Sequence, residues 1–173
     1  MTIAKYSAKY VYWDTQKQVV LPPSDIEIHR YNGRLKLPKH IVRFDSHHEF
    51  RVYIELCRMY GSKCISRQYK VKTIEPCTCY PTGKYWKVDF AVSLPGSMFF
   101  YDYLIEAKGV ITSEFINNLV LIEQTGFEAF ESLYIVFPHI VPANNKVIKA
   151  LQNNGWEQRL FTFKQFRQLD GLL

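Results

Sequence analysis

The stretch from Tyr85 to Gly109 constrains the fold of this chain more than any other part of the sequence. It reads YWKVDFAVSL, then a Pro-Gly-Ser turn, then MFFYDYLIEAKG. Apolar residues alternate with polar ones in both runs, which is typical of strands, and the turn between them allows the two strands to pair. Pairing would bring Asp89 of the first strand next to Glu106 of the second.

The strand period of two predicts which side chains share a face. Val88 and Phe90 lie on one face of the first strand and Asp89 on the other. In the second strand Glu106 and Lys108 lie on the same face, about 7 Å apart along the strand. An isolated Glu-x-Lys is usually a solvent-facing pair at a strand end, so this one gains meaning from the aspartate expected beside it.

The segments around this pair predict alternating helices and strands. Ser46 is a natural N-cap and Gly61 a natural stop for a helix, and a strand over 64–74 follows. Downstream, the sequence predicts a helix over 112–126, a strand over 132–137, a helix over 143–155, a strand over 159–163 and a helical turn over 164–169. The core order of helix, three strands, helix and strand indicates an α/β domain built on a mixed sheet.

The N-terminal region has a different character. Strand-like runs over 9–14 and 18–23 precede an Asn32-Gly33 pair, which is a strong hairpin signal between strands. We therefore expect a β-ribbon or arm over 1–43 and a core over 44–173, within one compact domain overall.

Positive charge is concentrated in one part of the chain. Residues 30–87 contain thirteen Lys or Arg and four Asp or Glu, a net charge of +9, whereas the whole chain carries +6. Such a belt favours a polyanionic partner such as nucleic acid, and a solvated basic face that aids solubility is the alternative. The expected phosphate contacts are Arg30, Arg34, Lys36, Arg51, Arg67, Lys70 and Lys72.

The cysteines disfavour a structural zinc site. Cys77 and Cys79 are separated by one residue, whereas structural zinc usually takes paired ligands two to four residues apart at both ends of a motif. Completion by another cysteine or by the histidines at 47–48 is the alternative. We expect reduced, ordinary thiols.

Hydropathy predicts an intracellular, cytoplasmic protein with no membrane partner. No uncharged apolar stretch is long enough to span a bilayer, and the N-terminal MTIAKYSAKY lacks the apolar core of a secretory signal.

Two acids and an amine at one strand edge predict a particular chemistry. Adjacent carboxylates repel unless a proton or a cation lies between them, and Mg²⁺ or Mn²⁺ prefers carboxylate and carbonyl oxygens. Lys108 would then orient or deprotonate the attacking water, or stabilise charge on a phosphate. Asp89, Glu106 and Lys108 thus outline a site for metal-dependent phosphodiester hydrolysis.

The same residues resemble the PD-(D/E)XK nuclease superfamily. The resemblance is carried by Glu49 in a helix, Asp89 in VDF, and Glu106 and Lys108 in IEAKG. KYSAKYVYWD and FDSHHEF are also similar to the opening of small phage-type endonucleases, a group that is similar to Holliday-junction resolvases.

The resemblance covers roughly residues 44–137 and departs from the family pattern in two ways. Val88 stands where the signature has proline, and residues 19–42 form an insertion relative to compact members. The insertion bears on the biological role more than on the chemistry.

The resemblance implies a restriction-endonuclease-like core that cleaves DNA with Mg²⁺ or Mn²⁺, in a homodimer from a phage or another mobile element. It implies that Asp89, Glu106 and the backbone carbonyl of Ala107 bind the metal, that Glu49 is an auxiliary ligand, and that Lys108 is the catalytic lysine. Branched junctions, specific duplex sites and transposon ends cut with a partner protein all stay open as substrates.

Several alternatives stay open at this point. Glu49 also fits a capping box that starts at Ser46, and Gln68 is a weaker candidate for the active face. A DNA-binding module of the same fold without catalysis, and a nonenzymatic basic protein, are the rival function classes. The complete Asp, Glu and Lys set argues against an inactive module, because such a relative is free to lose one of them.

Overall fold

The computed structural model describes residues 10–26, 29–31, 34–125, 128–142, 145–153 and 155–171. The chain divides into two compact units, Met1–Arg51 and Val52–Leu173. The expected division into 1–43 and 44–173 stays a prediction.

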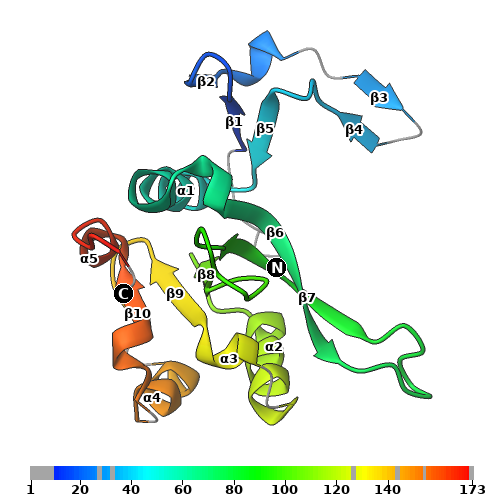
Figure 1. Ribbon diagram of the computed structural model, residues 1–173, viewed down its shortest axis with the longest axis vertical. Helices are drawn as coiled ribbons and strands as arrows, with labels where there is room; N and C mark the ends of the chain where they lie inside the picture. Colours follow the sequence, from blue (N-terminus) through cyan, green and yellow to red (C-terminus); the bar gives the residue numbers. More distant parts are fainter. Residues whose placement is uncertain are drawn as a thin grey trace, which may run out of the picture. The chain divides into compact units, whose positions relative to one another are not determined.

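Two small antiparallel sheets make up the first unit (Figure 1). One has the order β2-β1-β5 and the other pairs β3 with β4. The strands are β1 (Val11–Asp14), β2 (Val19–Leu21), β3 (His29–Tyr31), β4 (Arg34–Lys36) and β5 (Ile41–Phe44), with a 3₁₀ turn at Pro23–Asp25. The strands expected over 9–14 and 18–23 are confirmed, whereas β5 was not predicted. The Asn32-Gly33 turn lies outside the described residues.

Helix α1 (His47–Tyr60) has the ends that its sequence predicts. The Ser46 hydroxyl accepts a hydrogen bond from the backbone N–H of Glu49 at 3.0 Å, which is the N-cap contact. Gly61 follows the helix with a φ of +82°, a conformation that favours glycine.

A five-stranded mixed sheet forms the centre of the second unit, in the order β10-β9-β8-β7-β6 (Figure 1). The first three strands in sequence pair antiparallel, and the last two join in parallel, so the expectation of a mixed α/β sheet is confirmed. The strands are β6 (Ile65–Ile74), β7 (Lys84–Val92), β8 (Tyr103–Ala107), β9 (Leu133–Phe137) and β10 (Leu160–Thr162).

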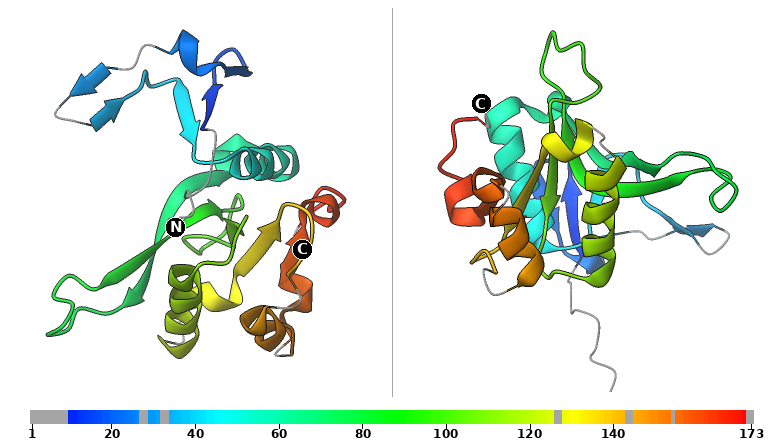
Figure 2. Two further views of the ribbon diagram at one scale, coloured as in Figure 1. Left: turned by 180° about the vertical axis from the view of Figure 1, so that it is seen from behind. Right: turned by 90° about the horizontal axis from the view of Figure 1, so that it is seen from below.

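The predicted helices of the second unit occur in the predicted order, and the short helix over 128–131 is an addition that was not predicted. The helices are α2 (Ser113–Thr125), α3 (Glu128–Glu131), α4 (Lys146–Asn153) and α5 (Phe163–Phe166), with 3₁₀ turns at Ser62–Cys64 and Trp156–Arg159. α2 and α4 bury an apolar stripe in the same core cluster as one face of the sheet, and Figure 2 shows α2 beside the strands. None of the helices in the described part of the chain is long and apolar enough to cross a bilayer.

One expectation for β7 is wrong, because the side-chain alternation breaks at Asp89. Val88 and Ala91 lie in the same core cluster, whereas Phe90 stacks on Tyr53 of α1 at 6.1 Å. Val88 and Phe90 therefore face opposite sides of the sheet. The partner strand β6 is irregular at the same point, because Gln68, which faces Asp89, has a φ of +51°. The side-chain alternation of β6 therefore reverses there as well.

The start of α2 has a capping contact whose contribution to stability can be measured. Thr112 caps the helix, since its hydroxyl accepts a hydrogen bond from the backbone N–H of Phe115 at 3.2 Å. Thr112→Ala is expected to lower the free energy of unfolding by about 1 kcal/mol in chemical denaturation, because one helix-end N–H loses its acceptor. Thr112→Ser keeps the hydroxyl and is the matched control; an equal loss in both variants would contradict the capping role.

Candidate active site

Asp89 lies where strands β7 and β8 part. Their ladder pairs Phe90 with Ile105, and the next facing positions in the same register are Asp89 and Glu106. At this point the carboxylate of Asp89 accepts a hydrogen bond from the backbone N–H of Ala107 at 2.9 Å. The side chain thus takes the place of a backbone acceptor, and the two strands separate beyond it.

Gln68 fixes the other oxygen of this carboxylate. Its side-chain amide donates to Oδ1 of Asp89 at 3.4 Å, from the strand on the far side of β7. The unusual backbone of Gln68 and this contact occur at the same position, so the weaker candidate of the sequence lies at the centre of the site. An amide donor helps to hold the carboxylate in one orientation.

Glu106 and Lys108 lie on one face at the end of β8, as their spacing predicts. Nζ of Lys108 is 3.3 Å from Oε1 of Glu106, and it lies 4.6 Å from the ring centre of Phe115 on α2. Glu106 is 5% exposed, so its charge is largely removed from water. The neighbouring ammonium and the aromatic face keep this acid and this base at fixed places.

A polar groove of about 530 Å³ opens beside these two residues. It runs between the edge of β7 and α2, where β7 no longer pairs with β8. Its charged lining includes Glu106, Glu114, Lys84, Lys87 and Lys108. The wall of the groove therefore carries more cations than anions.

The donor atoms at this site suit a hard divalent cation. Asp89 and Glu106 supply carboxylate oxygens, and each oxygen has more than one lone pair, so the hydrogen bonds that it accepts do not exhaust it. The N–H of Ala107 points to Asp89, and the carbonyl of an extended residue points to the same side as its N–H, so that oxygen faces the same gap. An oxygen-only set fits Mg²⁺ or Mn²⁺ rather than a thiophilic metal.

No group of three His, Cys, Asp or Glu side chains that could hold a metal ion occurs in the described residues. The candidate site matches this finding, since it offers two side-chain carboxylates and needs main-chain and water oxygens as further ligands. Metal binding therefore stays a prediction.

Glu49 belongs to the first unit, and its capping role is visible there. Its Oε2 accepts a hydrogen bond from the backbone N–H of Asp45 at 2.9 Å, one residue before the cap that a capping box would use. The residue is 4% exposed. The structure thus shows the carboxylate turned back onto the start of α1, and its catalytic role stays a prediction.

The predicted phosphate contacts have different surroundings. Lys70 and Arg51 are exposed, Lys72 pairs with Glu75 at 3.0 Å, and Arg67 is half-buried with its Nε fully buried. Arg30, Arg34 and Lys36 lie on β3 and β4, and their side chains are outside the described part of the structure.

Sequence reasoning missed the contribution of α2 to the site. Phe115 supports Lys108, while Asn117 and Asn118 line the groove. Asn118 is 7% exposed and lies on the buried stripe of the helix with Leu119 and Ile122. A polar residue within an apolar helical stripe is the signal that points to this position.

Two titratable groups behind the sheet are packing residues rather than acid–base groups. Burial and a hydrogen bond with Cys57 raise the pKa of Tyr53 to about 12, and burial raises the pKa of the Cys57 thiol. Both groups are therefore neutral near pH 7. Cys77 and Cys79 are exposed in the loop between β6 and β7, and all four cysteines are free.

Comparisons with protein-family models, with curated proteins and with solved structures each gave no match to this chain.

Asp89 has a structural role that can be separated from any catalytic one. Asp89→Ala is expected to lower the free energy of unfolding by about 1–3 kcal/mol, because the N–H of Ala107 loses its acceptor. Asp89→Asn keeps a side-chain carbonyl for that bond, and Gln68 can turn its amide to match, so we expect most of the stability to return. Urea unfolding of both variants checks this, and equal losses would show that the bond contributes nothing specific.

Proposed function

We propose that this protein is a metal-dependent endonuclease with a restriction-endonuclease-like PD-(D/E)XK core, which hydrolyses phosphodiester bonds in DNA. One observation supports it above the others: Asp89 and Glu106 occupy facing positions where β7 and β8 part, and Lys108 lies 3.3 Å from Glu106. The order of helix, three strands, helix and strand agrees with that core.

Asp89, Glu106 and the carbonyl of Ala107 would hold a Mg²⁺ or Mn²⁺ ion. When bound, such an ion polarises a phosphoryl oxygen and makes a water molecule more acidic. Asp89 contributes a carboxylate that is already oriented by two hydrogen bonds, and Glu106 contributes one that is buried. Preorganised ligands of this kind do not have to reorient during the reaction.

Lys108 would stabilise negative charge on the phosphate and orient the attacking water. Its ammonium is held between the Glu106 carboxylate and the face of the Phe115 ring, with the side chain 19% exposed. Lys108 is also one of the residues that line the groove. A fixed cation at a developing charge is the type of interaction that lowers a phosphoryl-transfer barrier.

The proposal extends to the partner and the assembly. DNA fits the basic segment, and a homodimer supplies the second site that cleavage of both strands of a duplex or junction requires. A phage or mobile-element origin and action in the cytoplasm follow from the resemblance and belong to the same proposal.

Incubation of the pure protein with supercoiled and branched DNA tests the function. Cleavage is expected with Mg²⁺ and not with EDTA, and Lys108→Ala is expected to lower the single-turnover rate by about 100-fold or more. Lys149→Ala, at an exposed position on α4, is the matched control and should cut at the wild-type rate. Binding without any cutting would favour a DNA-binding module, and absence of both would favour a nonenzymatic protein.

Glu49→Gln tests whether this acid is more than a cap. Gln offers an oxygen for the N–H of Asp45, so the thermal midpoint should stay within about 1–2 °C of wild type. A neutral amide is a poorer ligand than a carboxylate, so cleavage should fall by about 10–100-fold. Cleavage at the wild-type rate would leave Glu49 as a cap only.

A further inference from the structure

A two-stranded ribbon extends from the sheet beyond Asp89. There, β7 pairs with β6 but no longer with β8, over the partners Tyr69–Val88 to Ile74–Lys84. Figure 1 and Figure 2 show these two strands projecting past α2. Two contacts fix the pairing near the end of the ribbon. The Thr73 hydroxyl donates a hydrogen bond to the Lys84 carbonyl at 3.2 Å. Gly83, with a φ of +74°, lies so close to the Ile74 carbonyl that a side chain at this position would clash.

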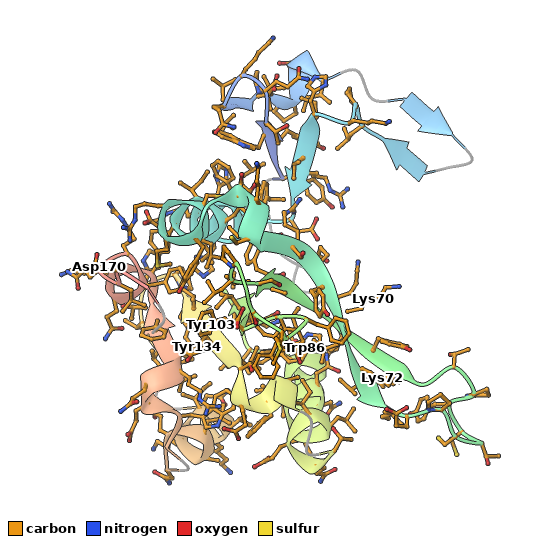
Figure 3. All side chains as sticks on the ribbon, viewed as in Figure 1. Lys70, Lys72, Trp86, Tyr103, Tyr134 and Asp170 are labelled. Atoms are coloured by element: carbon orange, nitrogen blue, oxygen red, sulfur yellow. The ribbon has the colours of Figure 1, made fainter. Side chains whose placement is uncertain are left out.

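The two faces of this ribbon differ in chemistry. Val71, Trp86 and Val88 are buried on the face toward α2. The ring centres of Trp86 and Phe115 are 5.9 Å apart there. The opposite face carries Lys70, Lys72, Tyr85 and Lys87. In Figure 3 the side chains of Lys70 and Lys72 point away from the body of this unit, and Trp86 points into it.

The outer face places two positive charges directly opposite each other. Lys70 and Lys87 are register partners, and both are exposed. Neither ammonium has a hydrogen bond or an ion pair within the described residues, whereas Lys72 beside them pairs with Glu75. Like charges at facing strand positions destabilise a sheet, so folding alone does not account for this pair.

The pair is continuous with the candidate active site. Lys87 also borders the groove that contains Glu106 and Lys108. Along β6, Lys70 lies two residues and Lys72 four residues from Gln68, which contacts Asp89. At about 3.4 Å per residue, these lysines are about 7 and 14 Å from the site along the strand.

We propose that the outer face of the ribbon binds the phosphate backbone of a double-stranded arm on one side of the cleavage point. The inference rests on the proposed function for the position of the cut. A polyanion relieves the repulsion between Lys70 and Lys87, and the reach of about 14 Å corresponds to about four base pairs at 3.4 Å per base pair. Tyr85, 49% exposed on the same face, adds an aromatic surface beside the backbone contacts.

The test is equilibrium binding to a labelled 20-base-pair duplex in EDTA, where cutting does not interfere, over a series of salt concentrations. Lys70→Gln and Lys87→Gln are each expected to reduce the slope of log K against log salt by about 0.9, and the double variant by about twice that. The affinity of the double variant for the duplex should fall by about tenfold. The thermal midpoint of the double variant should stay the same or rise, because the repulsion between the two lysines is gone. Lys149→Gln on α4 removes the same charge and should change neither slope nor affinity.

The outcomes separate the two proposals. If wild-type protein binds DNA and the double variant has an unchanged slope of log K against log salt, the proposed role of the ribbon is overturned and the proposed nuclease activity is unaffected. A reduced slope with wild-type protein that never cuts in Mg²⁺ supports the ribbon and overturns the nuclease. Wild-type protein that does not bind the duplex, or that polyglutamate displaces as well as DNA does at equal charge, overturns a nucleic-acid partner for this face.

A truncation series tests the reach of the ribbon. Lys70 and Lys87 each lie two residues, about 7 Å, from the site along their strands, so substrates whose duplex ends fewer than about two base pairs from the cut on that side should bind wild type and the double variant equally. A full difference on such short substrates would contradict the assigned position of the arm.

Discussion

The hydrogen bond from the N–H of Ala107 to the carboxylate of Asp89 is the contact on which the candidate site depends. The ladder between β7 and β8 ends with Phe90 and Ile105. A strand that leaves its neighbour exposes backbone groups, and an unsatisfied one in a buried setting costs about 1–3 kcal/mol. Asp89 supplies the missing acceptor, so the sheet opens at one defined place and an acid is held in the opening.

The opening has consequences on both sides of β7. Toward α2 it leaves the groove in which Glu106 and Lys108 lie. Toward solvent it leaves a stretch of β7 that, within the described residues, pairs with β6 alone, and the outer face of this ribbon carries Lys70 and Lys87 at facing positions. One break in strand pairing thus produces the acidic site, its entrance and a basic surface that leads to it.

Charge is arranged differently at these two places. Glu106 and Lys108 neutralise each other in a setting largely shielded from water, where Phe115 adds a further contact to the ammonium. Lys70 and Lys87 repel each other in water, where salt screens them. The first arrangement holds an acid and an amine at fixed places, and the second is a modest instability of the sheet.

Local rules were enough to predict the order of the main helices and strands of the second unit, the cap at Ser46, and the shared face of Glu106 and Lys108, since a strand repeats every two residues and a helix end needs an acceptor. The reversal at Gln68 and Asp89 was not predictable, because glutamine rarely adopts a positive φ and nothing in its neighbours marks the site. The roles of Phe115 and Asn118 depend on which face of α2 meets the free edge of β7. The sequence by itself determined which chemical groups the chain carries and in what order; only tertiary packing decided where the sheet opens, since that depends on contacts between residues distant in sequence.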